Sequence, residues 1–194
     1  NEIRIDQDGF DDDEFVELIG TPGQSLDGYS YIVIGDGVGG SGVLEAVVDL
    51  TGLVIAPDGF LSLGEASMSI AIPDVIVNLN FENTDNVTHM LVGGLTALLG
   101  DDLDADDDGV LDAVYWTELV DAVGLVELGF EGEVLDLLYT DTLLGPIGTY
   151  PPSHVFRCPD GGDWVLGVFA SLLMDTPGEP NMCDRLEERR VGKA

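Results

Sequence analysis

Short apolar runs alternate with polar turns along most of the chain. The runs are rich in Val, Ile, Phe and Tyr and are bounded by Gly, Pro, Asp or Asn, which is typical of β-strands joined by tight turns. We expect strands over residues 14–20, 29–35, 45–55, 60–64, 74–81, 87–94 and 154–158. Helical patterns are limited to residues 115–123 and 131–139. The pattern therefore predicts an all-β sandwich or barrel with long loops.

A glycine run at residues 35–40 fits the G-x-G-x-x-G pattern of a dinucleotide-binding turn. That function would require the run to open a helix and further strand–helix units to follow. The β-branched residues after the run and the Pro-Asp-Gly turn at 57–59 favour paired strands instead. We therefore interpret the glycine run as a hairpin loop.

The net charge of the chain restricts the classes of partner that we expect. The 194 residues include 38 Asp and Glu but only six Lys and Arg, which gives a net charge of −32. Such a chain repels phosphate backbones, so nucleic acid is not an expected partner. No apolar run is long enough to span a membrane, and we expect no membrane insertion. Dense carboxylates suit divalent cations or saline surroundings, although a solvated acidic surface without a specific site is the alternative.

The basic residues are concentrated in a C-terminal tail, residues 184–194, which holds four of the six. The segment at about 119–148 is rich in Leu and Val, more than a solvent-facing insertion should be. We expect this apolar insertion and the basic tail of neighbouring copies to drive self-association into a homo-oligomer or filament. A tail folded back on its own body is the alternative.

The strongest local motif is the acidic loop at residues 102–112, which resembles the first half of an EF-hand loop. Carboxylates recur at alternate positions and Gly109 provides the sharp turn, so several oxygens converge on one hard cation. The predicted calcium ligands are Asp104, Asp106, Asp108, the carbonyl of Val110, and Asp112. Position twelve is Tyr115 rather than the usual Glu, so we expect weak affinity, roughly 10⁻⁴ to 10⁻³ M.

The two cysteines, Cys158 and Cys183, are compatible with one disulfide in an oxidising compartment. Two buried free thiols are the alternative.

The two histidines, His89 and His154, both lie within expected strands, where we expect them to be packed and hydrogen-bonded. No metalloprotease or nucleophile-elbow motif occurs. We therefore expect no catalytic activity.

Several segments, in this order, resemble the lamin-tail domain of secreted bacterial proteins. They include "NEIRIDQDGFDDDEFVEL" at the start, "NFENTDNVTHMLVGG" in the middle, and "HVFRCPDGGDW" and "DTPGEPN" towards the end. The resemblance implies one immunoglobulin-like β-sandwich over residues 1–183, used as a non-catalytic module. The insertion at about 119–148, which has room for a short helix, and the tail at 184–194 extend beyond the usual domain.

Together these features predict a secreted or cell-surface, calcium-stabilised β-sandwich protein with a structural, adhesion or self-assembly role. The alternative is an accessory binding or targeting module of a larger secreted hydrolase, such as a nuclease or phosphatase. Both hypotheses assign the chain a binding or structural role rather than chemistry of its own.

Overall fold

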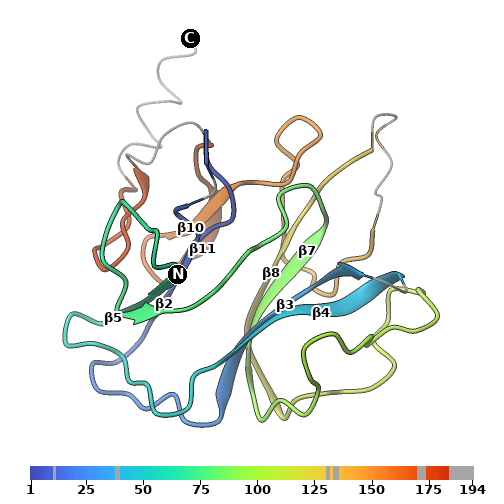
Figure 1. Ribbon diagram of the computed structural model, residues 1–194, viewed down its shortest axis with the longest axis horizontal. Helices are drawn as coiled ribbons and strands as arrows, with labels where there is room; N and C mark the ends of the chain where they lie inside the picture. Colours follow the sequence, from blue (N-terminus) through green and yellow to red (C-terminus); the bar gives the residue numbers. More distant parts are fainter. Residues whose placement is uncertain (11, 38–39, 130–131, 133–135, 170–173, 184–194) are drawn as a thin grey trace. The chain divides into compact units, whose positions relative to one another are not determined.

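The computed structural model describes residues 1–10, 12–37, 40–129, 132, 136–169 and 174–183. The chain separates into two compact units that each contain one β-sheet (Figure 1). Unit 1 comprises Asn1–Gln24, Val54–Asn80 and the chain from Ser153 onward, and unit 2 comprises Ser25–Leu53 and Phe81–Pro152.

The sheet of unit 1 joins strands from both ends of the chain. Its strands are β1 (Glu2–Arg4), β2 (Phe15–Ile19), β5 (Phe60–Gly64), β6 (Val75–Ile76), β10 (His154–Cys158) and β11 (Asp163–Leu166). They lie in the order β11-β10-β1-β2-β5-β6, antiparallel except for the β5–β6 pair. β1 lies between β10 and β2, and all three of its residues are buried.

The sheet of unit 2 has the order β4-β3-β7-β8-β9. Its strands are β3 (Tyr29–Gly37), β4 (Gly40–Asp49), β7 (Val87–Gly93), β8 (Glu118–Leu125) and β9 (Leu143–Leu144). β3 and β4 are antiparallel neighbours (Figure 1), and the register of the pair places Gly37 opposite Gly40. The interpretation of the glycine run as part of a hairpin is thus confirmed, although residues 38–39 lie outside the described residues.

One face of this second sheet carries an apolar cluster on alternating strand positions. Its buried members are Ile32, Ile34, Leu44, Met90, Val92, Ala97 and Leu103. Partly buried side chains from the long segment between β7 and β8 pack against it, Trp116 among them, and so does Tyr139. The acidic loop therefore belongs to the segment that covers this face of the sheet.

The predicted all-β class is confirmed, since the described residues form two sheets, as a β-sandwich has. The helix expected at 115–123 is wrong, because β8 begins at Glu118 and pairs with β7 along its length. Backbone pairing with a buried neighbour has overridden a short amphipathic pattern. Of the other expected helix, at 131–139, residues 131 and 133–135 lie outside the described residues, and residues 136–139 are not helical. In the part of the chain that is described, no helix has the length and apolarity to cross a membrane.

Candidate metal centre

The acidic loop is fixed to β4 by its backbone. Leu44 N donates to the Asp101 carbonyl at 2.9 Å, and Leu103 N donates to the Gly42 carbonyl, also at 2.9 Å. Leu103 itself is fully buried in the apolar cluster. The sequence Leu-Asp-Ala-Asp therefore begins with an anchor in the core, and the carboxylates that follow are held at a defined place above the sheet.

Asp104 is the central carboxylate of this loop and has no solvent exposure. One oxygen accepts a hydrogen bond from Gly109 N at 2.9 Å and from the Tyr139 hydroxyl at 2.9 Å, and the other accepts from Asp108 N at 3.2 Å. Burial alone would raise the pKa of Asp104, but these donors outweigh it and lower the pKa. The carboxylate is consequently ionised at neutral pH.

Three of the five predicted ligands come together. Carboxylate oxygens of Asp104, Asp106 and Asp108 lie within 4.8 Å of one another. The negative charge of Asp108, and then that of Asp112, contributes to a raised pKa of Asp106. Asp112 is outside the group of three, and its carboxylate accepts a hydrogen bond from Ala105 N at 3.1 Å. The trio offers the hard oxygen donors that calcium prefers.

Gly42 on β4 makes this arrangement possible. Its φ of +93° lies in the left-handed region, and a Cβ at this position would lie 2.7 Å from Asp104 Cβ and 3.0 Å from the Tyr139 hydroxyl. A side chain at position 42 would thus collide with the central carboxylate of the loop. Gly42, two residues beyond the glycine run at 35–40, accordingly lets the acidic loop approach β4.

Unit 2 contains a second acidic group that the sequence analysis missed. Carboxylate oxygens of Asp36, Glu45, Glu82 and Asp85 lie within 4.8 Å of one another. Asp85 is only 4% exposed, and it accepts hydrogen bonds from Asp36 N at 3.1 Å and from Asn86 N at 2.6 Å. These four side chains could also hold a metal ion. We refer to them as the four-carboxylate cluster.

The four-carboxylate cluster is electrostatically unfavourable without a cation. Burial, and then repulsion from Glu82, Asp85 and Asp36, raises the pKa of Glu45 to about 8. Burial also raises the pKa of Asp85 to about 7, with a further contribution from a hydrogen bond to Asp136. One carboxylate oxygen of Glu45 has neither solvent contact nor a hydrogen-bond partner. At neutral pH the cluster therefore holds protons or a cation.

No local sequence motif predicts the four-carboxylate cluster. Its members are separated by up to 49 residues and come from β3, β4 and the segment before β7. Register shifts in the β3–β4 pair at Val33/Ile34 and Gly35/Asp36 influence which side chains share a face, and sequence alone does not reveal such shifts. The one available signal is regional, because residues 25–53 and 81–152 contain twenty acidic residues and no Lys or Arg.

In unit 1, a basic side chain offsets the negative charge of the buried carboxylates. Glu2, His154 and Asp175 form a third group of potential metal ligands. The Arg4 guanidinium lies beside this group and donates hydrogen bonds to the Asp175 carboxylate. The side chains of all four residues are fully buried. The His154 Nε2 atom lies 2.7 Å from Glu2 Oε1, and burial lowers the pKa of His154 to about 3. Arg4 therefore already occupies the place where a metal ion would supply positive charge.

The other histidine is also enclosed. His89 on β7 is 1% exposed, and its Nδ1 atom lies 2.6 Å from the Tyr31 hydroxyl. Burial lowers the pKa of His89 to about 3. Both histidines are packed and hydrogen-bonded, as their positions in strands predicted.

The structure contains the predicted disulfide between Cys158 and Cys183, with the two Cα atoms 5.6 Å apart. It connects the end of β10 to the last described residue of the chain. The predicted basic tail, 184–194, lies outside the described residues.

Comparisons of the chain with protein-family models, with curated proteins and with solved structures found no match in any of the three. The resemblance to the lamin-tail domain therefore stays a prediction that rests on the motifs quoted above.

Proposed function

We propose that this chain is a non-catalytic, calcium-stabilised β-sandwich module of a secreted or cell-surface protein, with a structural or adhesion role. The observation that carries the proposal is the convergence of Asp104, Asp106 and Asp108 around a fully buried central carboxylate. The three carboxylates lie close together, and the sequence of unit 2 supplies no basic side chain to offset their mutual repulsion, so a bound cation would stabilise the loop.

Calcium suits this loop better than a transition metal. The donors are carboxylates, without a His or Cys nearby in the loop sequence, and oxygen donors suit calcium and magnesium. The loop backbone is hydrogen-bonded to β4, so an ion that fixes the loop would also stabilise its attachment to the sheet. This supports a stabilising role for the ion rather than a catalytic one.

The state of the histidines supports a non-catalytic function. Both have a pKa of about 3 because of burial, so neither exchanges protons near neutral pH. Cys158 and Cys183 form a disulfide, which removes them as nucleophiles and favours an oxidising, extracellular setting.

The test is thermal unfolding with chelator and with millimolar calcium. For a dissociation constant of roughly 0.5 mM, 5 mM calcium stabilises the fold by about 1.4 kcal/mol, or roughly 3–6 °C in Tm. Asp106→Asn and Asp108→Asn should each reduce this shift, whereas Asp163→Asn in unit 1 should leave it unchanged. An identical Tm in chelator and calcium would contradict the proposal.

A further inference from the structure

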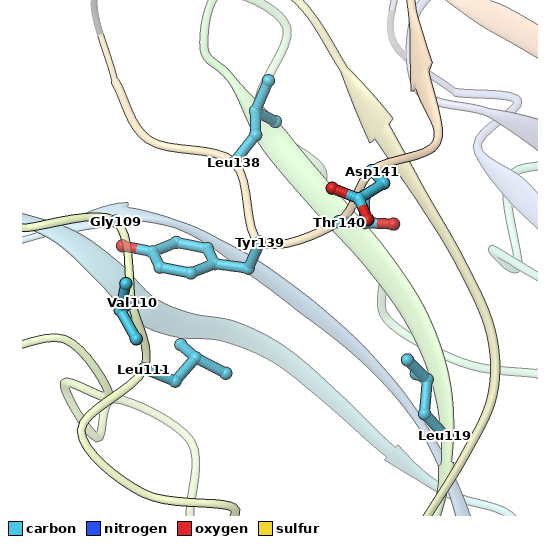
Figure 2. Close-up of a pocket in the computed structure, with 8 residues that line it drawn as sticks. All are labelled: Gly109, Val110, Leu111, Leu119, Leu138, Tyr139, Thr140 and Asp141. Atoms are coloured by element: carbon cyan, nitrogen blue, oxygen red, sulfur yellow. The ribbon is translucent and has the colours of Figure 1, made fainter.

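A groove of about 510 Å³ opens beside the acidic loop in unit 2. It is lined by Gly109, Val110, Leu111, Leu119, Leu138, Tyr139, Thr140 and Asp141. In Figure 2 the Tyr139 ring points towards Gly109 and Val110, and Leu119 of β8 lies on the other side of the groove. The acidic loop, β8 and residues 138–141 therefore build this surface together.

The walls of the groove are anchored to the sheet. Leu137 N donates to the Ser41 hydroxyl at 3.2 Å, and Tyr139 N donates to the Thr88 hydroxyl at 3.0 Å. On the opposite side, the Tyr139 hydroxyl donates to Asp104 and so connects this wall to the acidic loop. Hydrogen bonds to β4, β7 and the loop thus hold the groove open as a preformed surface.

Apolar side chains are left exposed along the groove. Val110 is 66% exposed and Leu119 is 50% exposed. Exposed apolar side chains gathered at a groove usually mark an interaction site. A partner that covers these side chains must itself contribute apolar groups.

The charge around the groove limits what that partner is. Asp141 is exposed at the groove, and unit 2 carries twenty acidic residues without a single Lys or Arg. An acidic or neutral polar partner would lose solvation here without gaining an opposite charge. Lys and Arg combine an aliphatic stem with a cationic end, so they fit apolar walls beside a carboxylate. A second copy of this acidic body is disfavoured by like-charge repulsion.

We infer that the groove binds an extended basic segment of a partner protein, in which apolar side chains alternate with Lys or Arg. β9 pairs with only the last two residues of β8, Gly124 and Leu125, so an extended segment can follow the preceding part of this strand. Alternation would direct one set of side chains onto Val110 and Leu119 and the other towards the surrounding carboxylates. This binding site goes beyond the proposed calcium function and does not depend on it.

The probe is a fluorescein-labelled heptapeptide of alternating Lys and Leu, titrated with the full chain in about 0.15 M salt. One control peptide replaces Leu with Gly and so keeps the positive charge. Another replaces Lys with Glu and so keeps the apolar groups. Fluorescence anisotropy should show the Lys–Leu peptide binding at least about tenfold more tightly than either control.

Two substitutions on the groove assign the binding to this surface. Combining Val110→Gln with Leu119→Gln should weaken binding of the Lys–Leu peptide about tenfold or more, whereas Ile72→Gln in unit 1, where Ile72 is 93% exposed, should change it less than about twofold. Asp141→Asn should weaken binding more than Glu179→Gln in unit 1 does. Thermal melts establish that each variant is folded.

Three results would overturn the inference. One is equal binding of the Lys–Leu and Lys–Gly peptides, and another is unchanged binding by the folded double variant. The third is a wild-type dimer in light scattering that the double variant dissociates, because a second copy would then occupy the groove.

Discussion

The electrostatics of the four-carboxylate cluster lead to a prediction that involves no ligand. We expect Glu45→Gln to stabilise the calcium-free protein at neutral and alkaline pH. Burial and three neighbouring carboxylates hold the pKa of Glu45 at about 8, against an ordinary value of 4.5. Unfolding releases the proton, because the unfolded chain binds it much less tightly. Between these two pKa values the folded state carries more protons, and its stability falls as pH rises.

The magnitude follows from the difference between the two pKa values. In the unfolded chain, the pKa of Glu45 lies about 2.5 units below pH 7. This difference corresponds to about 3 kcal/mol of destabilisation of the folded state, as an upper limit. Part of the Glu45 side chain retains solvent contact, so we discount this to about 1–2 kcal/mol. Glutamine imitates the protonated side chain and removes the effect. For a chain of this length the expected gain is roughly 3–6 °C in Tm.

The assay is thermal unfolding by circular dichroism in chelator, at several pH values from about 4.5 to 8. Near pH 4.5 the two proteins should melt at similar temperatures, and the advantage of Glu45→Gln should grow as pH rises to 8. The matched control is Glu179→Gln on the exposed surface of unit 1, which should leave Tm unchanged at every pH. A variant that melts at or below the wild-type temperature at pH 8 would refute the electrostatic argument.

Three further predictions concern other parts of the structure. Reducing the Cys158–Cys183 disulfide, which closes a loop of 25 residues, should cost about 3 kcal/mol of stability, measured by melts with and without reductant. Arg4→Met should destabilise by about 3–5 kcal/mol in urea unfolding, because it leaves buried carboxylates without their cation. Gly42→Ala should weaken the calcium response and destabilise by about 1–3 kcal/mol, through left-handed strain and collision with the loop. Gly52→Ala, at φ +86° with open space around it, should keep the calcium response.

Strands with clear periodicity were the predictable part of the fold. The expected runs at 14–20, 29–35, 60–64, 87–94 and 154–158 correspond closely to β2, β3, β5, β7 and β10. The run at 74–81 yields only the two-residue β6, because its pairing with β5 ends at Ile76. β1 has only three residues and lies beside β10 from the opposite end of the chain, a pairing that local patterns do not specify.

The acidic loop was predictable because its ligands lie within a few residues of one another. Alternate Asp residues followed by Gly109 describe a local geometry, and the structure brings Asp104, Asp106 and Asp108 together. The hydrogen bond from Tyr139 to Asp104 was not predictable, since it depends on a segment 35 residues away crossing the sheet. Nor was Gly42 identifiable as a packing requirement before β4 and the loop were placed side by side.

The two units illustrate two ways of accommodating buried carboxylates. In unit 1, Arg4 lies among Glu2, Asp175 and a neutral His154, so the protein's own side chain provides the positive charge. The sequence of unit 2 has no such side chain, and its buried carboxylates raise one another's pKa or depend on hydrogen-bond donors. Ions from solution are the remaining source of positive charge. The stability of unit 2 should consequently rise with the concentration of divalent cations in its surroundings.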